Sequence, residues 1–60
     1  MSTTRPIPYS DNIDLHYSPD DGGWYAQNYS SPMRSSQTIY PSRSALIADL
    51  DAGSHEWVAG

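Results

Sequence analysis

The sequence predicts an α+β domain in which a three-stranded antiparallel sheet carries one helix on a single face. Two short runs with strand patterns flank a Pro/Asp/Gly cluster at residues 18–23. A third β-favouring run follows at residues 37–40, and the apolar spacing then changes to that of a helix at residues 43–52. The expected order is therefore β-β-β-α, a two-layer arrangement.

The first strand is expected at residues 13–17. Its apolar positions Ile13, Leu15 and Tyr17 alternate with polar ones, so these three side chains should face the core. The segment that follows contains adjacent aspartates and adjacent glycines, a composition that favours a tight turn. The first two strands should therefore form a β-hairpin.

The second strand is expected at residues 24–29, and it carries aromatic residues on both faces. Periodicity leaves open which of these faces is buried. We expect either Trp24 or Tyr25 to lie under the helix, with the other ring and Tyr29 facing outward. One helix covers only one face of a sheet, so the uncovered aromatic face is a candidate interaction surface.

The third strand, at residues 37–40, is favoured by the high β-propensity of its threonine, isoleucine and tyrosine. The helix is expected at residues 43–52, with Ser42 as its N-cap and Gly53 at its C-terminal cap. After the helix, Trp57 is expected to return to the sheet.

Residues 1–10 contain two prolines and few apolar side chains, which is typical of a flexible leader, and residues 11–60 should form a single small domain. A chain of 60 residues buries a small core, and this one has no cysteine to form disulfides. We therefore expect support from oligomerisation, either as a homodimer or by folding onto a protein partner.

The chain is acidic, with 3 basic and 7 acidic residues and a net charge of −4. Duplex binding depends on several contacts from basic side chains to phosphates, so this balance disfavours nucleic acid as a partner. It favours a protein with a basic surface instead. No apolar run approaches the ~20 residues that span a membrane, and the first residues lack an apolar segment of signal-peptide length. The expected location is the cytoplasm.

No pattern in the sequence predicts an enzyme. We expect no catalytic residues, no cofactor site and no metal site. Its serines lack the Gly-x-Ser-x-Gly elbow, and Asp20 and Asp21 fit turn chemistry better than a pair of catalytic carboxylates. A zinc site could draw on both histidines and nearby acids, but the spacing signature of zinc ligands is absent. The four residues considered for zinc are Asp14, His16, His55 and Glu56.

The sequence thus indicates a small acidic, non-enzymatic protein-interaction module, such as an inhibitor or regulator that binds a basic host protein. Aromatic rings with a polar group suit interfaces, and carboxylates would steer the module to a basic surface. The residues expected to bind the partner are Trp24, Tyr25, Tyr29, Asp14, Asp20 and Asp21.

Two segments also resemble known small families; they are Asp20-Asp21-Gly22-Gly23-Trp24-Tyr25-Ala26 and Thr38-Ile39-Tyr40-Pro41-Ser42-Arg43-Ser44-Ala45-Leu46. From residue 13 to about residue 50, the chain resembles the HicB-like antitoxin module, without that family's Pro-Asp-Leu-Pro-Gly segment. It is also similar to the β-β-β-α arm-binding domain of phage-type tyrosine recombinases, without the basic hairpin. These resemblances imply a phage or mobile-element protein. The alternative functions are an antitoxin-like regulator or a nucleic-acid-binding module of the recombinase-arm type.

Overall fold

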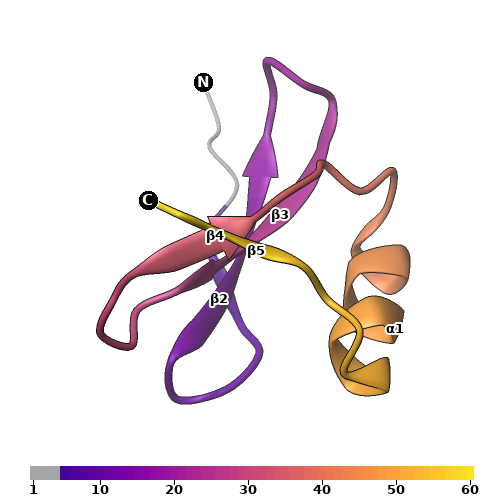
Figure 1. Ribbon diagram of the computed structural model, residues 1–60. Coiled ribbons are helices and arrows are strands. Elements are labelled where there is room, and N and C mark those ends of the chain that lie inside the picture. The colour runs from indigo at the N-terminus through magenta and orange to yellow at the C-terminus, as the bar shows by residue number, and fades with distance from the viewer. Residues whose placement is uncertain (1–4) are drawn as a thin grey trace.

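The computed structural model describes residues 5–60 and shows an α+β domain with five antiparallel strands and one short helix. The strands follow one another across the sheet in chain order, and the helix lies to one side of the sheet (Figure 1). The predicted three-stranded sheet is therefore wrong, because short strands extend it at both edges. The elements are β1 (Ile7–Pro8), β2 (Ile13–Ser18), β3 (Gly23–Asn28), β4 (Arg34–Ser36), α1 (Arg43–Ala52) and β5 (Trp57–Ala59).

Strands β2 and β3 form the predicted hairpin, with Ser18 opposite Gly23 at its closed end. Gly22 has a φ of 66°, a left-handed conformation that glycine adopts without a steric cost. Gly23 is needed for a different reason. A Cβ at this position would clash with the Ile39 side chain and with the carbonyl oxygen of Tyr40. Gly22 therefore allows the turn conformation, and Gly23 allows the chain at Ile39 and Tyr40 to pass close to the hairpin.

The sequence predicted a strand after β3 at residues 37–40, and this prediction is wrong. The strand that pairs with β3 is β4, at Arg34–Ser36. Pairing with β3 on one side and β5 on the other forms this polar strand, so tertiary contacts override its weak propensity. The chain then leaves the sheet and returns only at Tyr40, which makes an isolated bridge to Trp24.

Two segments outside the predicted sheet supply the edge strands. Within the expected leader, Ile7 and Pro8 pair with β2, so this part of the leader is ordered in the sheet. Residues 1–4 of that leader lie outside the described residues. At the other edge Trp57 returns to the sheet as expected, and it does so as the first residue of β5.

The helix has the predicted bounds and both predicted caps. The Ser42 hydroxyl accepts a hydrogen bond from the Ala45 amide at 3.1 Å, and Gly53 ends the helix with a φ of 74°. Leu46 is the buried residue of the helix and packs against Leu15 and Ala26 of the sheet. Within residues 5–60, no helix is long and apolar enough to cross a membrane.

The core lies between α1 and one face of β2 and β3. Leu15, Ala26 and Leu46 are its fully buried apolar residues, and partly buried rings and aliphatic side chains surround them. Trp24 belongs to this surrounding set and shares the helix side with Ala26, so the ring under the helix is Trp24. Tyr17 faces the same side but remains 37% exposed at the end of the hairpin. Such a small core makes polar contacts between elements important.

Candidate functional site

The sheet face opposite α1 is not covered by the helix, and we call it the open face. Strand alternation assigns its residues, because those opposite each other in the ladder share one face. His16 pairs with Tyr25, and Asp14 pairs with Gln27, all on the side opposite the buried Leu15 and Ala26. By the same register, the row through Asp14 and Gln27 continues to Ser35 of β4 and Val58 of β5.

Three rings on the open face are held together, and we call His16, Tyr25 and Tyr29 the open-face cluster. The rings of His16 and Tyr25 are stacked, with centroids 5.3 Å apart and an interplanar angle of 14°. The hydroxyl of Tyr29, which directly follows β3, lies 3.1 Å from Nε2 of His16. Tyr29 is 52% exposed, so this hydrogen bond ties an exposed ring to the sheet.

The open face carries the carboxylate of Asp14. Asp14 stands two residues before His16 on the same face. On the opposite side of the sheet, the guanidinium of Arg43 lies 5.9 Å from the Trp24 ring, and that of Arg34 lies 5.9 Å from the Trp57 ring. Among the described residues, no arginine lies over the tyrosines of the open-face cluster. Within residues 5–60, the arginines that contact aromatic rings therefore lie over the tryptophans and leave these tyrosine rings to other partners.

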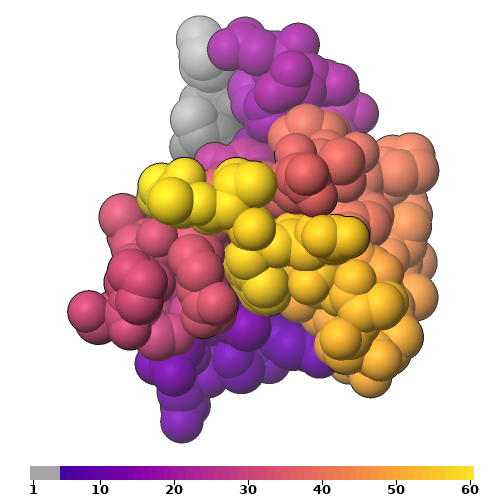
Figure 2. Space-filling model, in the orientation of Figure 1, coloured from indigo at the N-terminus to yellow at the C-terminus, as the bar shows by residue number. Residues whose placement is uncertain are grey.

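The six residues expected to bind a partner fall into three places. Tyr25, Tyr29 and Asp14 belong to the open face. Trp24 lies on the helix side. Asp20 and Asp21 are exposed in the hairpin loop, which projects at the top of the molecule (Figure 2).

The hairpin loop is closed by local hydrogen bonds. The Ser18 hydroxyl donates to Asp21 at 2.9 Å, and the Asp21 amide donates to the Ser18 carbonyl at 3.2 Å. Asp21 thus has the turn role that its sequence context indicates. His16 was missed as a member of the site, although its position in a strand of alternating residues already placed it on the face opposite Leu15.

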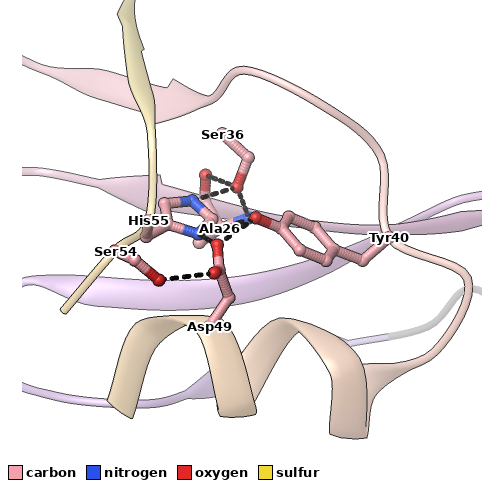
Figure 3. A network of polar contacts seen from close by, with 6 residues as sticks. All are labelled: Ala26, Ser36, Tyr40, Asp49, Ser54 and His55. Atoms are coloured by element: carbon pink, nitrogen blue, oxygen red, sulfur yellow. Dashed lines mark hydrogen bonds and ion pairs between the residues drawn. The ribbon is translucent and has the colours of Figure 1, made fainter. Parts of the chain in front are cut away.

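A second cluster lies on the helix side, where a polar network joins the sheet, the loop at Tyr40, α1 and the segment before β5 (Figure 3). The His55 side chain is 3% exposed and stands at its centre. Its Nε2 lies 2.8 Å from the Ser36 hydroxyl, and its Nδ1 lies 3.1 Å from a carboxylate oxygen of Asp49. The Tyr40 hydroxyl donates to the same oxygen, and the Ser54 hydroxyl donates to the other one at 3.0 Å.

Ser36 connects this network to the sheet. Its hydroxyl oxygen accepts from the Ala26 amide at 2.7 Å, at the point where β4 leaves β3. With a proton on Nδ1 directed to Asp49, Nε2 of His55 accepts from the Ser36 hydroxyl. The network therefore links β3 and β4 to the helix and to the segment before β5.

The network changes the acidity of two of its members. Hydrogen bonds from Tyr40 and Ser54 lower the pKa of Asp49, and the contact with His55 adds to this effect. Burial raises the pKa of Tyr40, and the hydrogen bond to Asp49 raises it further. An ionised Asp49 and a neutral Tyr40 are thus the favoured states at neutral pH.

The sequence did not predict the chain of contacts from Ser36 to His55 to Asp49, because no serine stood in a recognisable pattern with a histidine and an aspartate. The three residues belong to β4, to the segment before β5 and to α1, so no local sequence motif could predict that they meet. The Ser36 hydroxyl oxygen accepts a hydrogen bond from the Ala26 amide. The geometry therefore directly supports a structural role, in which the network holds the sheet and the helix together. The two histidines considered for zinc lie on opposite sides of the sheet. Residues 5–60 contain no group of three or more His, Asp or Glu side chains placed to hold a metal ion.

In comparisons with known proteins, this chain matches no family model, no curated protein and no solved structure. The resemblances to the HicB-like module and to the recombinase arm domain therefore stay predictions.

Proposed function

We propose that this protein is a small binding module whose open face holds the arginine or lysine side chains of a partner protein. The observation that supports it is the open-face cluster of His16, Tyr25 and Tyr29, which is pre-ordered by stacking and a hydrogen bond. Pre-ordered rings lose little conformational entropy when they bind. A regulator or inhibitor would act by masking a basic surface of this kind.

The chemistry of the face favours a cation as the bound group. The face of a tyrosine ring attracts a guanidinium or an ammonium by about 0.5–2 kcal/mol, depending on how far the pair is desolvated. Asp14 supplies a carboxylate on the same face, and the net charge of −4 would steer a basic partner toward the domain. The chain already places an arginine over each of its tryptophans, so guanidinium–aromatic contacts are part of its own structure.

Fluorescence anisotropy with a labelled arginine-rich peptide tests the proposal. Tyr29→Ser removes an exposed ring from the open face and should weaken binding about 3- to 10-fold, which corresponds to the loss of one cation–aromatic contact. Tyr17→Ser is the matched control, because it removes a partly exposed ring on the helix side and should leave the affinity unchanged. Equal losses in both variants would contradict the proposal.

A second pair of variants separates a specific site from general charge attraction. Asp14→Asn and Asp20→Asn remove one carboxylate each, from the open face and from the hairpin loop. The proposal predicts that only the first weakens peptide binding at about 0.15 M salt, where exposed distant charges are screened. Binding to duplex DNA at low salt that exceeds binding to the basic peptide would instead support the nucleic-acid alternative.

A further inference from the structure

The two edges of the sheet differ in how well they could accept another strand. Strand β1 has two residues, one of them is Pro8, and Pro6 precedes it. Proline has no amide hydrogen to donate, and short, proline-containing edges resist pairing with a further strand. Strand β5 (Trp57–Ala59) contains neither a proline nor a charged residue. It also lies on the surface of the molecule, drawn in yellow in Figure 2.

The register of β5 shows which of its backbone groups point outward. The Gln37 amide donates to the Glu56 carbonyl at 3.0 Å, and the Gly60 amide donates to the Met33 carbonyl at 3.3 Å. These bonds join the residues that directly flank the two strands, so Glu56 and Gly60 direct backbone groups toward β4. Val58, two residues from each and opposite Ser35, directs its backbone groups the same way. Since successive residues of a strand direct their backbone groups to opposite sides, those of Trp57 and Ala59 point to the outer edge.

We propose that a second copy of this chain pairs with this outer edge, strand β5 against strand β5, around a two-fold axis at Val58. In this antiparallel register, Trp57 stands opposite Ala59 of the partner subunit, and Ala59 stands opposite Trp57 of the partner subunit. Each such pair exchanges two backbone hydrogen bonds. The outward groups of both strands are thereby satisfied.

The side chains of β5 fit this self-pairing. Val58 is 41% exposed, and at the two-fold axis it meets Val58 of the partner subunit on the open face. The largest residue of the strand, Trp57, lies opposite the smallest, Ala59 of the partner subunit. Glu56 falls opposite Gly60 of the partner subunit, so the pairing places no like charges directly opposite each other. A strand with a charge or a proline at its centre would lack this self-complementarity.

The pairing goes beyond the proposed function and does not depend on it. A two-fold axis perpendicular to the sheet keeps both open faces on the same side, so the dimer would present two open-face clusters to one partner. Two linked sites can raise the overall affinity for a partner with repeated basic segments far above that of either site. The domain, whose core contains three fully buried apolar residues, would also extend its sheet.

Sedimentation equilibrium of the purified chain over about 5 μM to 1 mM tests the dimer, with twice the monomer mass of 6.7 kDa expected at the upper end. Val58→Lys places two ammonium groups opposite each other at the axis and should weaken dimerisation at least about 10-fold. Tyr17→Lys is the control, because it makes the same charge change on β2, away from the edge. Circular dichroism checks that each variant is folded.

A rescue experiment makes the pairing specific. Val58→Glu alone should also weaken the dimer, and an equimolar mixture of Val58→Glu with Val58→Lys should restore it as a heterodimer, since opposite charges then meet at the axis. A wild-type chain that stays monomeric at 1 mM would overturn the proposal. The proposal would also be overturned if the Val58→Lys variant dimerised as tightly as the Tyr17→Lys control. Neither result would affect peptide binding by the open face, which the anisotropy experiment measures in the monomer.

Discussion

The side-chain hydroxyl of Ser36 accepts the backbone amide of Ala26 at 2.7 Å and so takes the place of a carbonyl group in the β3–β4 pairing. Backbone pairing between these strands ends at Gln27 and Ser35, one residue before. The same hydroxyl contacts His55, which contacts Asp49 of the helix. A serine thus closes a gap in the sheet and connects the sheet to the helix.

Replacing Ser36 by alanine should lower the free energy of unfolding by about 1–3 kcal/mol, because it leaves the buried Ala26 amide and Nε2 of His55 without a partner. Ser35→Ala is the matched control, since Ser35 is the neighbouring residue on the open face and its side chain has no such role. Urea denaturation measures both. A Ser36→Ala variant as stable as Ser35→Ala would show that the hydroxyl contributes nothing.

Asp49 should make the protein sensitive to acid. Its pKa is lowered in the folded state by hydrogen bonds from Tyr40 and Ser54, so the ionised carboxylate stabilises the fold above its unfolded pKa of about 4. This contribution is lost as the pH falls through the lowered pKa. Asp49→Asn should therefore be less stable than the wild type at pH 7, and the difference should shrink toward pH 2.

Thermal unfolding between pH 2 and pH 7 measures this difference. Asp11→Asn removes an exposed carboxylate and should follow the wild-type profile. A gap between Asp49→Asn and the wild type that stays constant with pH would mean that the carboxylate's ionisation is not linked to folding.

Tyr40 should act at the alkaline end of the pH range. Burial raises its pKa, so its stabilising effect is present below about pH 10 and is lost as the pH rises through the raised value. Tyr40→Phe should be less stable than the wild type at pH 7, with a difference that narrows above pH 10. Chemical denaturation at pH 7, 9 and 11 measures it. A difference that widens with pH would contradict the assignment.

The two glycines of the hairpin should respond differently to alanine. Gly22→Ala introduces a left-handed alanine, at a cost of about 1–2 kcal/mol. Gly23→Ala forces a Cβ against the carbonyl of Tyr40 and the side chain of Ile39, and overpacking of this kind adds about 1–3 kcal/mol. The second variant should also weaken the bridge between Trp24 and Tyr40, which hydrogen exchange at these amides would report. Equal exchange rates in both variants would argue against a tight crossing at Gly23.

The parts of the fold that were predictable carry their signals locally. The hairpin follows from alternation around a Pro/Asp/Gly turn, and α1 follows from Ser42, Gly53 and the apolar spacing between them. Strand β4 was not predictable, since Arg34–Ser36 has no strand propensity and forms by pairing on both sides. Residues 37–40 have high strand propensity, but apart from the single bridge of Tyr40 to Trp24 they pair with no neighbouring strand within residues 5–60.

The candidate site was predictable only in part. Tyr25 and Tyr29 were expected to face outward if Trp24 lay under the helix, but both faces of β3 carry aromatic rings, so the sequence could not decide between them. Packing of Trp24 against the buried cluster of Leu15, Ala26 and Leu46 decides it. The contact between His55 and Ser36 joins residues 19 positions apart on elements that the sequence did not place together.

The most direct test of the binding proposal is a ¹H–¹⁵N NMR titration of the chain with the arginine-rich peptide at about 0.15 M salt. The proposal predicts that the largest shift changes occur at His16, Tyr25 and Tyr29, with smaller ones at Asp14 and Gln27. Shift changes centred on Asp20 and Asp21 in the hairpin loop, or on the acidic residues of α1, would show that charge alone guides the peptide and would contradict a binding site on the open face.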